Sequence, residues 1–131
     1  MFIGISARCV SLTSKSIKME QDKKTLAELY EFICKSENIP HLPLKFKRVG
    51  KGGACLTFCQ SKRTGQKIPL CIEVDLGRIC CGAAWALCHE VAHQIQIHKS
   101  NNSYHNAAFK KEEARLVNKY TRCKIANRLI F

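Results

Sequence analysis

The sequence contains few acidic side chains and no long apolar run. Its 131 residues include 10 Asp and Glu against 22 Lys and Arg, a formal net charge of +12 at pH 7. This excess of positive charge favours polyanions or acidic surfaces as partners. No apolar stretch approaches the roughly 20 residues of a membrane-spanning helix, so we expect no membrane partner. The length corresponds to a single domain, and we expect a monomer.

The nine cysteines follow neither a disulfide pattern nor a zinc-ribbon pattern. Their number is odd, the chain has no clear signal peptide, and no C-x-x-C pair occurs. We therefore expect reduced thiols, most of them small core residues, in a cytoplasmic or nuclear protein.

The N-terminal segment has a composition of its own. Residues 1–18 contain three basic side chains, four serines and no acid, which fits a mitochondrial presequence or a disordered tail, and Met19 is an alternative translation start. We predict a flexible tail over residues 1–20 and a folded domain over residues 21–131.

The spacing of apolar residues predicts an α+β fold. A capped leading helix should begin after Thr25 and end before Pro40. Alternating residues predict strands over 44–47 and 54–60, paired as a hairpin through a flexible turn at 50–53. A third strand should bury one face, formed by Ile68, Leu70, Ile72 and Val74. We expect a buried central helix over 79–97, with Trp85 in the core. A polar loop should follow over 99–104, and an amphipathic helix over 106–127.

The central helix carries the motif H-E-x-x-H at residues 89–93. Residues four apart share a helix face, so His89 and His93 can present two imidazoles to one Zn²⁺, with Glu90 beside an activated water. Such an ion acidifies its water and polarises a carbonyl, while the carboxylate moves the proton. The motif therefore predicts a zinc hydrolase with Glu90 as the general acid/base.

A catalytic zinc ion normally takes three protein ligands, so one more donor must lie beyond this helix. The candidates are His98, His105, Glu112 and Glu113. His98 follows His93 by five positions, which turns it away from the ligand face. The two glutamates follow at a spacing common for a third ligand on the next helix. Glu73, on the preceding strand, is a candidate for orienting a ligand imidazole.

The sequence around the motif resembles the SprT-like metalloprotease family, which includes the Spartan proteases. The resemblance consists of His89-Glu90-Val91-Ala92-His93, a polar loop after it, and then His105 with Phe109 four residues later. The order of a leading helix, a three-stranded sheet and a zinc helix over residues 26–120 is also similar. The resemblance implies a zincin-like minimal metalloprotease in which His89, His93 and His105 bind zinc and Glu90 is catalytic. Members usually have Gly after the third His, whereas this chain has Asn106, which tolerates a left-handed turn well.

Basic residues should lie around two turns and along the C-terminal region. If these regions lie on one side of the active-site cleft, their positive side chains would bind the phosphates of a nucleic-acid backbone. They are Lys45, Lys47, Arg48, Lys51, Lys62, Arg63, Lys67, Lys110, Lys111, Arg115, Lys119, Arg122, Lys124 and Arg128. The resemblance implies a protease acting on DNA-associated or DNA-crosslinked proteins.

Two alternatives stay open. The chain is also similar to the ImmA/IrrE type of zinc peptidase, which would make Glu113 or Glu112 the third ligand. The other alternative is a non-enzymatic, basic nucleic-acid-binding module whose metal is structural or absent, or whose histidines belong to the core.

Overall fold

The computed structural model describes residues 2–49, 52–79 and 81–130, with side chains from residue 16 onward. The fold is a small α+β arrangement of three α-helices and a three-stranded mixed sheet. Its elements, in chain order, are α1 (Phe2–Glu37), β1 (Leu44–Phe46), β2 (Ala54–Gln60), β3 (Lys67–Val74), α2 (Ala83–Ser100), α3 (Ala107–Tyr120) and a short 3₁₀ helix, η1 (Ala126–Arg128).

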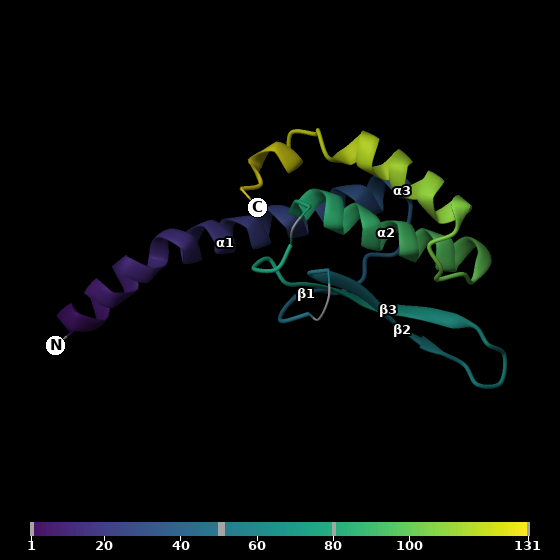
Figure 1. The fold of residues 1–131 in the computed structure, drawn as a ribbon, viewed down its shortest axis with the longest axis horizontal. Helices are drawn as coiled ribbons and strands as arrows, with labels where there is room; N and C mark the ends of the chain where they lie inside the picture. The colour runs from purple at the N-terminus through teal and green to yellow at the C-terminus, as the bar shows by residue number, and fades with distance from the viewer. Residues whose placement is uncertain (1, 50–51, 80, 131) are drawn as a thin grey trace.

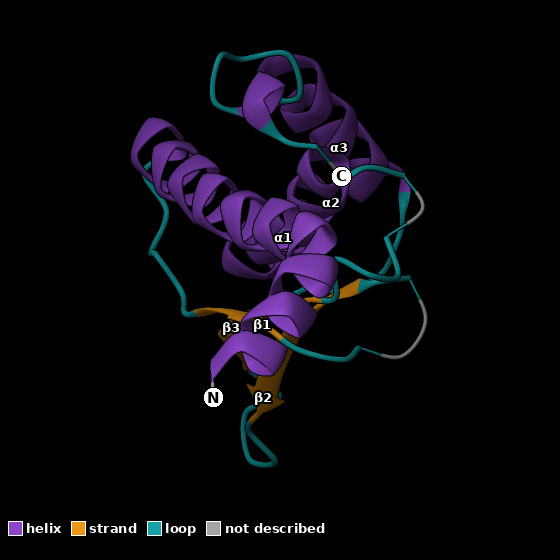
Figure 2. Cartoon of the chain, turned by 90° about the vertical axis from the view of Figure 1, so that its left-hand side faces the viewer, coloured by secondary structure: helices purple, strands orange, loops and turns teal. Residues whose placement is uncertain are grey.

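The helices cover one face of the sheet (Figure 1). α2 packs on β2 and β3 and also contacts α1, while α3 packs on α2. The core between these layers contains Leu29, Ile33, Ile72, Leu87 and Val91, all fully buried. The N-terminal part of α1 extends past the sheet and the other helices (Figure 1), and Figure 2 shows α2 and α3 above the strands. Within the described residues, no helix is both long and apolar enough to cross a membrane.

The strand order is β1-β3-β2, with β1 parallel and β2 antiparallel to the central β3. The predicted hairpin between the first two strands is therefore wrong, because β1 and β2 lie on opposite sides of β3. The connection between them passes the end of β3, where the Gly53 carbonyl accepts a hydrogen bond from the Asp75 N–H at 2.7 Å. Gly53 has φ +75°, and a Cβ there would lie 2.9 Å from the Ile79 nitrogen, so only glycine fits this approach. Residues 50–51 of the predicted turn lie outside the described part of the chain.

The third strand buries only half of its predicted apolar face. Ile72 and Val74 are buried, but Ile68 and Leu70 are each 49% exposed. A register shift at Thr57/Phe58 interrupts the alternation between them, because a bulge changes which side chains face the core. The remaining part of the β2–β3 hairpin extends beyond the core (Figure 1).

The predicted bounds of all three helices differ from the observed ones. The central helix runs over Ala83–Ser100 rather than 79–97. The first helix does not begin after Thr25; it runs from Phe2, and Thr25 is buried in its interior. No Gly or Pro between residues 5 and 39 interrupts it. The last helix ends at Tyr120 rather than continuing to 127, and the chain turns there before η1.

Most of the cysteines whose side chains the structure describes are not core residues. Cys34, Cys71 and Cys88 are buried, whereas Cys59 and Cys81 are exposed and Cys55 and Cys123 are partly exposed. The expectation that most cysteines fill the core is therefore wrong for these side chains.

Candidate metal centre

Helix α2 places two histidines and a glutamate at one end of a cleft. His89 and His93 lie one turn apart on the helix face that meets α3, with ring centroids 5.0 Å from each other. Glu90 points toward the sheet and is only 5% exposed. The polar side chains of α2 therefore point in two directions. The imidazoles of His89 and His93 face α3, and the carboxylate of Glu90 lies next to β2.

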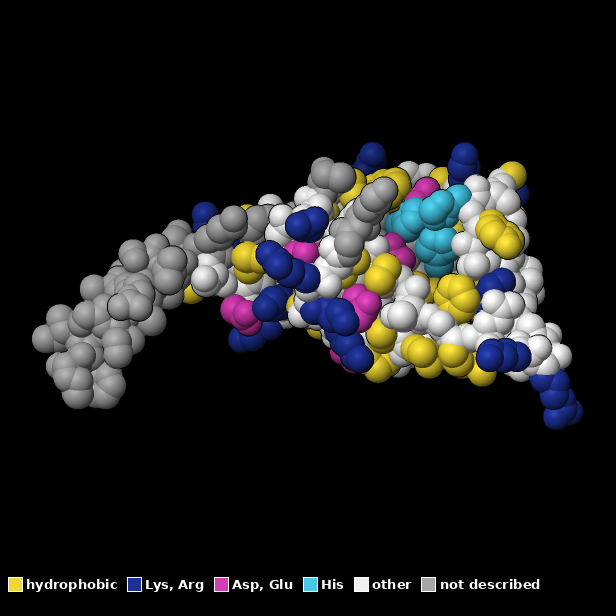
Figure 3. Space-filling model, turned by 60° about the horizontal axis from the view of Figure 1, so that its bottom comes forward, with side chains coloured by type: hydrophobic (Ala, Val, Ile, Leu, Met, Phe, Trp, Pro, Cys, Tyr) yellow, Lys and Arg dark blue, Asp and Glu magenta, His cyan; other side chains and the backbone are white. Residues whose placement is uncertain are grey.

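His105 completes a cluster of three imidazoles. It lies on the loop between α2 and α3, and its Nε2 is 2.9 Å from the Nε2 of His93. One ring nitrogen from each of His89, His93 and His105 lies within 4.8 Å of the others. Among the described residues this is the one group of three His, Cys, Asp or Glu side chains close enough to hold a metal ion. Figure 3 shows the histidines (cyan) gathered at the surface.

Phe109 is the packing base of this cluster. It lies on the first turn of α3, is 1% exposed, and its ring centroid is 5.1, 4.4 and 4.8 Å from those of His89, His93 and His105. Because a buried aromatic ring limits the rotamers of the side chains on it, Phe109 restricts all three imidazoles. The spacing of four residues between His105 and Phe109 thus has a direct structural reason.

Asn106 begins α3 and does not adopt the left-handed turn that we expected. Its φ of −83° and ψ of −177° are extended, and its side-chain oxygen accepts a hydrogen bond from the Phe109 N–H at 2.9 Å. Asparagine is among the best residues for this N-cap position because it satisfies an N–H that the helix itself leaves free. The cap fixes the start of α3 between His105 and Phe109.

Glu113 contacts a ligand candidate but lies outside the nitrogen cluster. Its Oε2 pairs with Nδ1 of His89, from the next turn of α3. A carboxylate on one ring nitrogen fixes the tautomer that leaves the other nitrogen free to coordinate a metal. Glu73, which we considered for this role, pairs instead with Lys47 Nζ at 2.8 Å and Cys55 Sγ at 3.4 Å.

The other third-ligand candidates lie elsewhere. Glu112 pairs with Arg115 at 2.6 Å and with Lys99 at 4.0 Å. His98 is exposed near the end of α2 and lines a separate cleft with Lys67 and Pro40. The structure thus brings His105 to His89 and His93, and it brings neither Glu112 nor His98 there.

Burial changes the pKa values of two groups at the site. It raises the pKa of the Glu90 carboxyl to about 7, although the nearby His89 and the Leu56 backbone N–H act in the opposite direction. Burial, together with the neighbouring His89 and His105, lowers the pKa of His93 to about 4. His93 is therefore neutral at pH 7, the form that donates a lone pair to a metal.

A cleft of about 580 Å³ opens beside the histidines. Its apolar walls come from β2 and α2 and include Ala54, Leu56, Phe58, Trp85, Ala86 and Ile97. Trp85 is 37% exposed and stacks on His89 with a centroid distance of 6.0 Å, so its prediction as a core residue is wrong. Its indole forms a wall of the cleft, one helical turn before the first histidine.

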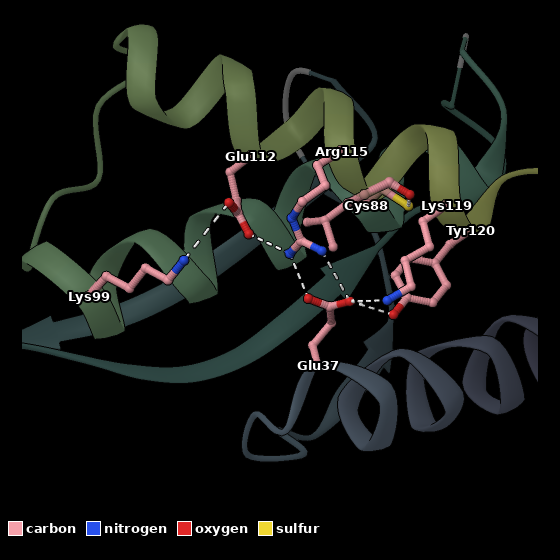
Figure 4. A network of polar contacts seen from close by, with 8 residues as sticks. Glu37, Cys88, Lys99, Glu112, Arg115, Lys119 and Tyr120 are labelled. Atoms are coloured by element: carbon pink, nitrogen blue, oxygen red, sulfur yellow. Dashed lines mark hydrogen bonds and ion pairs between the residues drawn. The ribbon is translucent and has the colours of Figure 1, made fainter.

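A polar network anchors α3, and with it Glu113, to α1. The Glu37 carboxylate, only 8% exposed, accepts from Arg115 at 2.5 Å, Lys119 at 3.2 Å and the Tyr120 hydroxyl at 2.5 Å (Figure 4). Arg115 holds the pKa of Glu37 at about 2, and the Tyr120 and Lys119 hydrogen bonds contribute in the same direction. The site is thus assembled on three helices.

On the face that carries the histidines, the described basic side chains do not form one continuous patch (Figure 3). Lys47, Arg115, Lys119 and Arg128 are paired with carboxylates, and Lys51 lies outside the described residues. Lys62 and Arg63 lie at the tip of the β2–β3 hairpin. On the face that carries the histidines, Figure 3 shows Lys and Arg (dark blue) in separate groups.

Sequence reasoning missed two residues that shape the site. Asn101 was only part of a predicted polar loop, although Asn at a helix C-terminus signals a left-handed cap. Glu113 was considered as a ligand and not as a partner of His89, and no local signal distinguishes the two roles.

Comparisons of the chain with known protein families, with curated proteins and with solved structures found no match.

Proposed function

We propose that the protein is a zinc-dependent endopeptidase with a zincin-like, SprT-like active site. The observation that carries the proposal is the convergence of His89, His93 and His105, with ring nitrogens within 4.8 Å, beside the buried carboxylate of Glu90. Three protein ligands and an open cleft are typical of catalytic zinc, whereas structural zinc usually has four.

The donor set fits Zn²⁺. Two nitrogens bound tetrahedrally at 2.0–2.1 Å would lie about 3.3 Å apart. The observed 2.9 Å between His93 and His105 requires only a small separation of the two rings. Zinc readily takes neutral imidazole ligands, and His93 is neutral at pH 7. Glu113 would hold His89 in the coordinating tautomer.

When bound, Zn²⁺ would activate a water molecule and polarise the scissile carbonyl. The Glu90 carboxylate would accept the proton of the attacking water and then deliver it to the leaving amine. β2 is one of the two edge strands of the sheet and is the one that lines the cleft, so a substrate backbone could pair along it. Apolar substrate side chains would contact Phe58 and Trp85.

The positive charge of the chain supports an association of this peptidase with DNA. The net charge is +12, and Lys62 and Arg63 lie in the turn that follows β2, the strand that lines the cleft. These features support cleavage of DNA-associated or DNA-crosslinked proteins, with binding that weakens as salt increases. A cytoplasmic or nuclear location would suit this function.

The test measures bound zinc and cleavage of casein, with and without single-stranded DNA. Glu90→Gln should keep the zinc and the fold but reduce cleavage by about 10²–10⁴-fold. His105→Ala should lose zinc, whereas His98→Ala, a matched histidine at the exposed end of the same helix, should keep it. The ImmA/IrrE alternative predicts instead that His105→Ala keeps zinc, and that Glu113→Ala or Glu112→Ala abolishes its binding. Undiminished cleavage by Glu90→Gln would refute the role of Glu90.

A further inference from the structure

The loop that carries His105 begins at Asn101, where α2 ends. Asn101 adopts the left-handed conformation, with φ 57° and ψ 26°, and its N–H donates to the Ile97 carbonyl at 2.8 Å. Asparagine tolerates this conformation better than any residue except glycine. The residue therefore stops the helix and sets the direction in which the chain continues toward His105.

The Asn101 side chain joins this point to the β2–β3 hairpin. Its Oδ1 accepts from the Lys67 N–H at 2.7 Å, and its Nδ2 donates to the Gly65 carbonyl at 3.0 Å. The Lys67 Nζ also donates to the Asn101 carbonyl at 3.0 Å. The two segments are 34 to 36 positions apart in the chain, so these bonds are tertiary contacts. Only an amide combines this donor and acceptor with tolerance of a left-handed backbone.

The rest of the loop is held by few contacts. Asn102 Oδ1 accepts from the Tyr104 N–H at 2.8 Å, and Lys67 Nζ lies 5.8 Å from the centroid of the Tyr104 ring. Tyr104 is 72% exposed, and His105 itself is exposed. Since burial does not fix this loop, its ends must: Asn101 on the hairpin and Asn106 at the start of α3.

His105 depends on this loop in a way that the other two histidines do not. His89 and His93 lie on α2, where helical geometry fixes their spacing, but His105 lies on the loop between α2 and α3, so its position depends on how Asn101 and Asn106 hold the two ends of that loop. An imidazole displaced by about 1 Å would lose coordination geometry, because metal–nitrogen distances vary by only about 0.2 Å.

We propose that Asn101 is a positioning residue for the metal centre: by pinning the end of α2 to the hairpin turn, it holds His105 at the distance at which all three imidazoles bind one ion. This inference rests on the proposed function, since it concerns the third ligand of the same site. Asn101 itself touches neither the metal donors nor the cleft that they border.

The experiment measures Zn²⁺ affinity of the full chain by competition with a chromophoric chelator. Asn101→Gly keeps the left-handed backbone but removes both side-chain bonds, and should weaken Zn²⁺ binding about 10–100-fold, the usual effect of losing a residue that orients a ligand. Asn101→Asp keeps the acceptor for Lys67 and loses the donor to Gly65, so its loss should be smaller. Gln60→Ala is the matched control, because Gln60 Nε2 also donates to the Gly65 carbonyl, at 3.2 Å, but from within the hairpin. It should leave Zn²⁺ affinity within about threefold of the original protein.

A double-mutant cycle separates positioning from a general structural role. With His105→Ala in place, Asn101→Gly should cause no further loss of Zn²⁺ affinity, because the ligand that it positions is gone. An equal loss in both backgrounds, or an Asn101→Gly affinity within threefold of the original, would overturn the proposal. If His105→Ala alone binds Zn²⁺ as tightly as the original protein, the proposed metal site itself fails, which is a distinct result.

Discussion

Replacing Glu37 by Gln should destabilise the protein by an amount that depends on pH. Glu37 joins the end of α1 to three side chains of α3, and its contacts lower its pKa from 4.5 to about 2. This lowering of the Glu37 pKa corresponds to about 3 kcal/mol of unfolding free energy. The side chain is only 8% exposed, so solvent weakens these contacts less than it would at the surface.

The sign follows from the direction of the shift. A carboxyl whose pKa is lower in the folded state stabilises fully above its unfolded pKa of 4.5, and this stability is lost as the pH falls toward 2. The difference between the original protein and Glu37→Gln should therefore be about 3 kcal/mol at pH 7 and about half of that at pH 3.

Urea unfolding followed by circular dichroism at both pH values measures this difference. Glu28→Gln is a matched control, because Glu28 also pairs α1 with a distant basic residue, Arg128, but both side chains are more than half exposed. It should change stability by less than about 1 kcal/mol at either pH. If Glu37→Gln lowers the unfolding free energy by the same amount at pH 7 and pH 3, the charge of Glu37 is not what stabilises the contact.

Two further substitutions test one contact at the metal site and one in the hydrophobic core. Glu113→Gln should weaken Zn²⁺ binding about 10–100-fold by loosening His89, whereas Glu112→Gln should not; chelator competition would measure both, and equal losses would contradict the role of Glu113. Tyr30→Phe should cost about 1–3 kcal/mol in urea unfolding, because the buried hydroxyl donates to Gln94 Oε1 at 2.8 Å and accepts from the Leu42 N–H at 3.2 Å. A cost below about 0.5 kcal/mol would mean that water replaces the hydroxyl.

Local patterns predicted the parts of the site that lie on single elements. The spacing of His89 and His93 placed both on one helix face, and the polar loop before residue 106 separated α2 from α3 as observed. These features depend on helical periodicity, which is a property of neighbouring residues.

Pairings across the chain were not predictable in this way. The sequence of β1 does not show whether it pairs with β2 or in parallel with β3, because both pairings require the same alternation of apolar and polar residues. Similarly, the contact of Glu113 with the outer nitrogen of His89 depends on how α3 lies across α2. That orientation is set by the buried side chains of Phe109 and Leu116. The missed contacts are thus those that depend on the packing of distant elements.

The contacts of the three histidines favour a ligand-binding role over a packing role. Histidines that serve a core are usually buried with their nitrogens satisfied, yet His105 is exposed and His93 borders an open cleft. The two Nε2 atoms face each other at 2.9 Å, so one proton at most can lie between them, and protonating both rings would create repulsion. A divalent cation between the rings would use both lone pairs at once, with Phe109 packed against both rings. The arrangement is therefore one that could hold a metal ion, as we propose.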